Sequence, residues 1–176
     1  MISFIRQSKV AMWILTVLRV YLGVLWVIAS SDKVFKPDFN AIGMIKGAIA
    51  LPLANKPGNP GNYVYGWFTD FLKATTQGGT NAGPFNFLVP YGELLVGIGL
   101  IVGCFTLAAN FFGLMMGFTY LLCGSLSNIP TLILIGFIIM MGGFNASKIG
   151  LDYWVTPFLR QHFKFLNNDI STRLDA

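Results

Sequence analysis

Four apolar stretches, each near the length needed to cross a bilayer, constrain the fold of this chain more than any other feature. They cover residues 10–31, 87–107, 110–127 and 130–147. A membrane-spanning helix needs about 20 mostly apolar residues. Only 11% of the 176 residues are charged and 55% are hydrophobic, whereas a soluble domain has about 25% charged residues. The sequence therefore predicts one all-α integral membrane domain over residues 1–176, a bundle of four transmembrane helices.

A long connection, residues 32–84, joins the first predicted span to the second. Within it, residues 39–53 are apolar but short and interrupted by glycine and proline, which favours an interfacial or re-entrant segment over a span. Residues 63–74 include Trp67 and Phe68 among apolar side chains at helical spacing. An aromatic-rich amphipathic helix of this kind lies well at the headgroup level. We therefore expect a long outer loop that contains interfacial helices.

The basic residues Arg6 and Lys9 precede the first span and favour a cytoplasmic N-terminus. An even number of spans returns the tail, residues 148–176, to the same side. A cleaved secretory signal is the alternative for the first stretch, but its apolar part is nearer a full span and contains Arg19. We predict a multi-pass protein of the plasma membrane with both termini inside the cell.

Two ionisable side chains lie well inside predicted spans: Arg19 in the first and Glu93 in the second. An isolated charge in hydrocarbon costs about 2.5 kcal/mol or more, so it is normally paired or used. Counting about 1.5 Å per residue places Arg19 about 13 Å from one face and Glu93 about 10 Å from the other. These depths permit contact across a core about 30 Å thick. We predict an Arg19–Glu93 ion pair that lines a polar cavity toward the outer face, with both residues as catalytic candidates.

The first span carries small and polar residues on one face. They are Arg19, Gly23, Trp26, Ser30 and Lys33, separated by four, three, four and three positions. Lys33, at the outer end, would add positive charge suited to a small anion or to the carbonyl of a lipid-soluble electron carrier. Arg19, Lys33 and Trp26 are therefore substrate-binding candidates, with Trp67 and Phe68 as a roof. The alternative is a packing face on which a structural partner neutralises Arg19.

The two cysteines, Cys104 and Cys123, are predicted to remain unpaired. Cys104 lies in the second predicted span close to the turn near Ala109, and Cys123 lies well over 10 Å from that turn along the third, whereas a disulfide needs Cα atoms within about 7 Å. The chain contains no haem, iron–sulfur or dinucleotide motif, and we predict no metal, haem or nucleotide cofactor. The net charge of +5 is not gathered in long runs, so no nucleic-acid partner is predicted.

Four segments, taken in order, form a recognisable pattern. They are LRVYLGVLWVIASSDKVFKPDF (18–39), NPGNYVYGWFTDFL (59–72), LVPYGELLVGIGLIVG (88–103) and GGFNASKIGLDYWVTP (142–157). Together they resemble the DoxX/DoxD family of small membrane proteins, which includes the large subunit of thiosulfate:quinone oxidoreductase. The resemblance places Arg19, Lys33 and Glu93 on the charged positions of the family. Its structural signature falls on Gly23, Gly92, Gly97 and Asp152.

The resemblance implies a four-helix protein of bacterial plasma membranes that associates with redox partners. The first hypothesis is a quinone-linked oxidoreductase subunit that oxidises thiosulfate or a related small anion. In it, Arg19 and Lys33 hold the anion or the carrier's head group, and Glu93 orients Arg19 or relays protons. The alternative is a non-catalytic membrane scaffold or assembly partner for a soluble redox enzyme. A small-solute transporter is disfavoured because no internal repeat is detectable. The bilayer is the expected environment; a second redox subunit, a soluble oxidoreductase and a homo-oligomer remain open.

Overall fold

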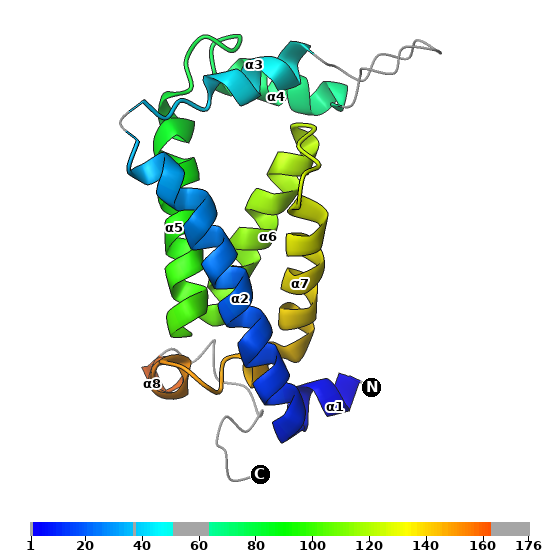
Figure 1. Ribbon diagram of the computed structural model, residues 1–176, viewed down its shortest axis with the longest axis vertical. Helices are drawn as coiled ribbons and strands as arrows, with labels where there is room; N and C mark the ends of the chain where they lie inside the picture. Colours follow the sequence, from blue (N-terminus) through cyan, green and yellow to red (C-terminus); the bar gives the residue numbers. More distant parts are fainter. Residues whose placement is uncertain (1, 37, 51–63, 163–176) are drawn as a thin grey trace.

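The computed structural model describes residues 2–36, 38–50 and 64–162, and its elements in this part of the chain are helices. The elements are α1 (Ile2–Gln7), α2 (Lys9–Val34), α3 (Ile42–Ala50), α4 (Gly66–Thr75), α5 (Gly83–Val102), α6 (Thr106–Leu122), α7 (Ile129–Gly142), the 3-10 helix η1 (Gly143–Ala146) and α8 (Asp152–His162). Helices α2, α5, α6 and α7 form a bundle (Figure 1). The predicted all-α class is confirmed.

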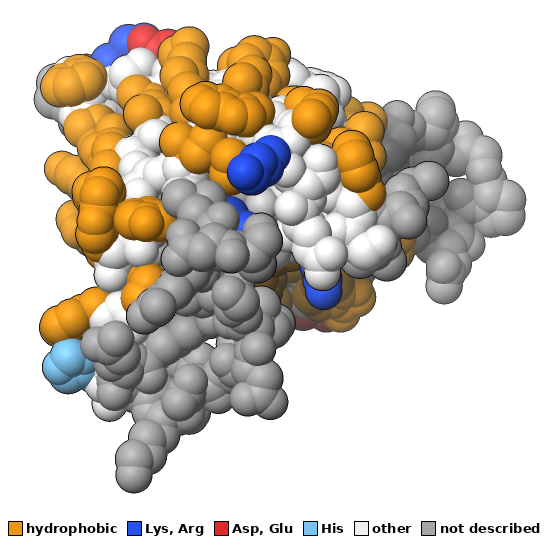
Figure 2. All heavy atoms as spheres, turned by 90° about the horizontal axis from the view of Figure 1, so that it is seen from below, with side chains coloured by type: hydrophobic (Ala, Val, Ile, Leu, Met, Phe, Trp, Pro, Cys, Tyr) orange, Lys and Arg blue, Asp and Glu red, His pale blue; other side chains and the backbone are white. Residues whose placement is uncertain are grey.

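Short helices lie at both ends of this bundle (Figure 1). Helices α3 and α4 lie across one end, which we refer to as the loop end. Helices α1 and α8 lie at the opposite end, the terminal end, where α8 runs transverse to the bundle. Seen from the terminal end, the described part of the surface shows many hydrophobic side chains and few charged ones (Figure 2).

Among the described residues, three helical segments are long and apolar enough to cross a membrane: α2, α5 and the continuous stretch Ile129–Ala146. Helix α6 is equally apolar but shorter, with 17 residues. The outside of the bundle exposes large apolar side chains, such as Val17 at 65%, Leu95 at 69% and Leu134 at 61%. Such exposure on every long helix is expected where lipid, not water, surrounds the bundle. The chain therefore has the character of an all-α membrane protein.

The end of α5 differs from the predicted span, which ran to residue 107. Gly103 adopts a left-handed conformation with φ of 69°, and its N–H and that of Cys104 both donate to the carbonyl of Gly99 at 3.0 Å. This glycine cap ends the helix at Val102 even though the apolar sequence continues. Phe105, also left-handed with φ of 52°, turns the chain so that α6 begins at Thr106 instead of residue 110.

Helices α2 and α5 meet through two of the predicted signature glycines. A Cβ added to Gly23 would lie 2.9 Å from the carbonyl oxygen of Gly97. A Cβ added to Gly97 would lie 2.7 Å from Cγ2 of Val27 and 2.9 Å from its backbone nitrogen. Neither position has room for a side chain, so the two backbones are in direct contact, as small residues allow in membrane helices. Gly92 differs, because its added Cβ would make an ordinary 3.4 Å contact with the flexible Met116.

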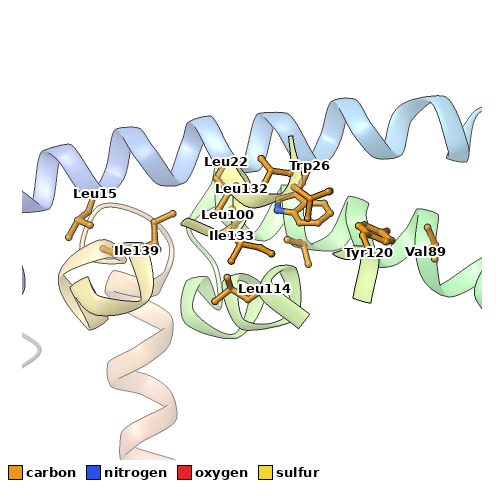
Figure 3. Packing of buried hydrophobic residues seen from close by; sticks show 13 residues of the cluster. Leu15, Leu22, Trp26, Val89, Leu100, Leu114, Tyr120, Leu132, Ile133 and Ile139 are labelled. Carbon is orange, nitrogen blue, oxygen red and sulfur yellow. The ribbon is translucent and has the colours of Figure 1, made fainter. Parts of the chain in front are cut away.

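The hydrophobic core runs beside α2 along the bundle (Figure 3). Leu15 and Ile139 lie toward the terminal end, Leu22 and Leu100 in the middle, and Tyr120 toward the loop end. Leu100 and Ile139 have no exposed surface, and Leu15 and Leu22 retain 2% each. The middle of the bundle is therefore filled mainly by apolar side chains, with the buried Asn110 of α6 bound to the carbonyl of Gly136.

The loop end has an apolar layer of its own, formed between α3 and α4. Ile45 of α3 and Phe68 and Leu72 of α4 are buried in it, at 2%, 4% and 2% exposure. The side-chain oxygen of Asn86 on α5 accepts the Ala41 N–H at 2.8 Å, which fastens the start of α3 to the bundle. The helix expected within residues 63–74 is confirmed as α4. The end of the predicted apolar segment at residues 51–53 lies outside the described residues.

Candidate functional site

Glu93 lies on α5 with only 1% of its surface exposed. Its carboxylate accepts hydrogen bonds from Nζ of Lys33, at 2.5 Å to Oε1 and 2.7 Å to Oε2. The hydroxyl of Tyr120 donates to Oε1 at 2.5 Å. These partners come from α2 and α6, so one carboxylate joins three helices of the bundle. We refer to Lys33, Glu93 and Tyr120 as the carboxylate triad.

The predicted Arg19–Glu93 ion pair is wrong. The Arg19 guanidinium lies directly against Gly103, where an added Cβ would overlap it. Glu93 and Gly103 are ten residues apart on α5, which corresponds to about 15 Å along the helix. Matching depths are not sufficient for contact, because the direction in which each side chain leaves its helix also decides its partner. Lys33 shares a face with Arg19 and reaches back toward Glu93, since helical side chains lean toward the N-terminus of their helix.

Arg19 belongs instead to a second polar group near the terminal end. Its Nη2 donates to the carbonyl of Ile149 at 2.7 Å, and its Nη1 donates to Oγ1 of Thr106 at 3.3 Å. The Asp152 carboxylate attracts the guanidinium and accepts the N–H groups of Phe105 and Thr106 at 2.7 and 2.8 Å. We refer to Arg19, Thr106 and Asp152 as the arginine cluster. It fastens the segment before α8 onto the α5–α6 turn and caps the start of α6.

The backbone around the arginine cluster is shaped to admit the guanidinium. An added Cβ at Gly150 would lie 3.0 Å from Nη1 of Arg19 and 2.9 Å from the Gly103 carbonyl oxygen. The Asp152 N–H donates to that same carbonyl at 2.7 Å. Nε of Arg19 is buried and has no hydrogen-bond partner among the described residues. Its Nη1 and Nη2 bind protein groups at the terminal end, away from Glu93.

Charge balance and aromatic contacts define the surroundings of the carboxylate triad. The Lys33 side chain is 28% exposed, whereas Tyr120 is 7% exposed. Nζ of Lys33 also lies 5.7 Å from the centroid of the Tyr120 ring, within the range of a cation–π interaction. The indole of Trp26 flanks the phenol, with ring centroids 6.4 Å apart. The triad is thus a neutral, almost fully buried group that reaches the surface through Lys33.

The other sequence-predicted site residues divide between packing and surface. The face of α2 that contains Arg19, Gly23, Trp26 and Ser30 is confirmed as buried. Phe68 packs in the α3–α4 layer, while Trp67 is 63% exposed and so does not cover a buried site with its ring. The structure therefore brings Lys33 against Glu93 and Trp26 beside Tyr120, and places Arg19 and Trp67 elsewhere.

Tyr120 is the functional candidate that the sequence interpretation missed. It lies in the predicted third span, among apolar residues that carry no charge. A phenol hydroxyl buried at such a position needs a hydrogen-bond partner. Glu93 is the buried carboxylate in the neighbouring helix, so the Tyr120–Glu93 hydrogen bond could have been predicted from the sequence.

Chemically, the triad combines one acceptor anion with two donors. A carboxylate can give or take a proton, and an ammonium and a phenol can donate hydrogen bonds to a carbonyl or an anionic oxygen. Cys104 and Cys123 are free thiols at opposite ends of α6, as their spacing predicts. They lie too far apart to act as a dithiol pair.

Comparisons with known proteins do not assign the chain to a family. No protein-family model matches it, and no curated protein and no solved structure matches it either. The resemblance to the DoxX/DoxD family stays a prediction, and the functional argument rests on the geometry of the carboxylate triad.

Proposed function

We propose that this chain is a quinone-linked membrane subunit in which the carboxylate triad binds a quinone head group and supplies protons to it. One observation carries the proposal: Glu93 is 1% exposed within an apolar helix and holds both Lys33 and Tyr120. Ionisable residues at such positions are costly and typically mark substrate, ion or proton pathways. A purely apolar bundle would need none of the three.

The chemistry of the triad fits a quinone. Quinone carbonyl oxygens accept hydrogen bonds. Nζ of Lys33 has three N–H donors, and it donates to the two carboxylate oxygens of Glu93, so that one donor remains. Lys33 and Tyr120 can stabilise the negative charge that grows on a carbonyl oxygen during reduction. Glu93 can pass a proton toward that oxygen. Full reduction adds two electrons and two protons, one proton to each oxygen.

The electrons need a source outside the carboxylate triad. A small sulfur anion such as thiosulfate can supply them: two such anions give up one electron each and join through a new S–S bond. A second redox subunit is the other source. The resemblance to the DoxX/DoxD family favours both, since thiosulfate-oxidising members work with a partner subunit.

We further infer that α6 crosses the bilayer with α2, α5 and α7, giving four crossings. Its 17 residues span about 26 Å, close to a core of about 30 Å. Gly113 and Gly117 set it tightly against its neighbours, because added Cβ atoms would lie 3.0 Å from Val96 and 2.9 Å from Ile133. The basic lead before α2 favours a terminal end inside a bacterial cell and a loop end outside it.

The proposal is tested by purifying the protein in native lipid and measuring bound quinone by mass spectrometry. The same preparations are then assayed for reduction of a quinone analogue with thiosulfate. We expect wild type to retain quinone, and Glu93→Gln and Tyr120→Phe to lose at least about tenfold in content and rate. Tyr91→Phe is the matched control, because Tyr91 lies on α5 with 44% exposure. Normal yield with normal quinone content and activity in Glu93→Gln would refute the proposal.

A non-catalytic scaffold is the second candidate, and one observation favours it. The charges of Lys33 and Glu93 satisfy each other, which is how a buried pair can fix helix register without any reaction. A scaffold would bind no quinone and show no turnover. It would instead co-purify with a soluble enzyme and lose that enzyme when the tail after His162 is removed.

A further inference from the structure

The carboxylate triad has unequal access to its surroundings. The Lys33 side chain is 28% exposed, while Glu93 and Tyr120 retain 1% and 7%. Lys33 lies in the last turn of α2, at the end that faces α3 and α4 (Figure 1). Lys33 is therefore the triad residue with the most surface exposed to the exterior.

In the opposite direction, toward the terminal end, the packing is mainly apolar, and the buried Asn110 of α6 donates to the carbonyl of Gly136 at 2.8 Å. The backbones of α2 and α5 touch at Gly23 and Gly97, and Leu22 and Leu100 fill the adjoining core at 2% and 0% exposure (Figure 3). Proton transfer needs a continuous chain of hydrogen-bonding groups, which aliphatic side chains do not provide. The arginine cluster begins only about 15 Å farther along α5.

Few other polar groups face the carboxylate triad. On α6, Cys123 lies close enough to Tyr120 to interact electrostatically. Next to Lys33 along the chain, Asp32 and Lys36 are 81% and 70% exposed and pair with each other at 3.7 Å. Helix α7 has no charged residue in its sequence. Lys33 is thus the cation that both holds Glu93 and meets the exterior.

We infer that the carboxylate triad exchanges protons with the loop end alone, with Lys33 as the connecting group. In the redox reaction, for which this inference rests on the proposed function, the Lys33 ammonium protonates the Glu93 carboxylate, and Glu93 passes that proton to the quinone oxygen. The resulting Lys33 amine then takes a proton from water at the loop end, which restores the ion pair. Two passes supply the two protons that reduction consumes. Quinone reduction therefore removes protons from the loop-side compartment.

The access route is tested without any quinone. Lys33→Cys is made in a chain that also carries Cys104→Ser and Cys123→Ala, and is reconstituted in sealed vesicles of known orientation. An impermeant trimethylammonium thiosulfonate is then applied from each side. We expect labelling from the same side as Lys36→Cys and not from the side that labels Lys9→Cys, which is exposed at the terminal end. Labelling of Lys33→Cys from the Lys9 side would overturn the inference.

The proton route is tested during turnover, with pH-sensitive dye inside and outside the vesicles. We expect alkalinisation on the loop side, slowed at least about tenfold by Lys33→Met and not by Lys36→Met. Attachment of an aminoethyl group to Lys33→Cys should restore the rate, whereas Lys33→Arg, which keeps the positive charge but does not give up its proton, should leave the rate low. Alkalinisation on the terminal side would refute the inference while leaving the proposed function intact. Absence of quinone reduction in wild type would refute the proposed function, and the labelling result would still decide the access route.

Discussion

Replacing Lys33 with methionine removes the cation that, among the described residues, contacts the buried carboxylate of Glu93. Nζ of Lys33 contacts both carboxylate oxygens, and Glu93 is 1% exposed. Methionine has a similar length but no charge. In this variant the carboxylate would retain the hydrogen bond from Tyr120 and lose its counterion.

The structure sets the expected order of stabilities. Removing one partner of a buried ion pair costs about 3–5 kcal/mol, because the other charge is left uncompensated. The 28% exposure of Lys33 and the ability of Glu93 to take up a proton reduce this to about 2–3 kcal/mol. Glu93→Gln should cost only about 1 kcal/mol, because the amide still accepts from Tyr120 and the freed ammonium can turn to water. The Lys33→Met/Glu93→Gln double variant should be more stable than Lys33→Met alone.

The measurement is reversible unfolding in mixed micelles, with the free energy of unfolding extrapolated to the same detergent composition for each variant. Lys36→Met is the matched control, since the Lys36 side chain is 70% exposed and should change stability little. A Lys33→Met protein as stable as Lys36→Met, or less perturbed than Glu93→Gln, would refute the argument that Lys33 neutralises a buried charge.

Two further variants test the close helix contact and the arginine cluster. Gly97→Ala should lose about 1–3 kcal/mol of stability, because its added Cβ would overpack against Val27. Gly92→Ala has ordinary space around its added Cβ and should be neutral or slightly stabilised. Equal effects of the two variants in thermal unfolding would contradict the α2–α5 contact. Arg19→Lys should lower stability by about 1–2 kcal/mol, because the contacts of Nη1 and Nη2 are lost together. Its quinone content per folded molecule should nevertheless stay unchanged, and a loss comparable to that of Glu93→Gln would return Arg19 to the functional site.

The parts of the fold that follow from local pattern were predictable from the sequence. Hydropathy located the long helices, and the spacing of Arg19, Gly23 and Trp26 identified the buried face of α2 because helical periodicity is a local property. Helix ends were less accessible. The left-handed cap at Gly103 stops α5 within an apolar run, and hydropathy carries no information about such a backbone conformation.

The partners of the buried charges could not be derived from depth. Two positions at similar depth meet only when their helices also turn the right faces toward each other, and sequence pattern does not give that relative rotation. Arg19 binds a backbone carbonyl at Ile149, 130 positions away, where no side-chain type signals an acceptor. Glu93 binds Lys33. Helical spacing predicted the correct face of α2 for Lys33, but we expected this residue at the mouth of a cavity and not in contact with the Glu93 carboxylate. Only the tyrosine partner left a signal, as a lone phenol within an apolar helix.

The unequal lengths of the helices have a consequence for the surrounding lipid. Helix α2 has 26 residues, or about 39 Å, and α6 has 17, or about 26 Å. Mismatch with a hydrocarbon layer about 30 Å thick is relieved by tilting of the long helix and by thinning of the layer beside the short one, at fractions of a kcal/mol per Å. With α6 as the proposed fourth crossing, we expect the lipid layer around this protein to be thinner along α6 than along α2.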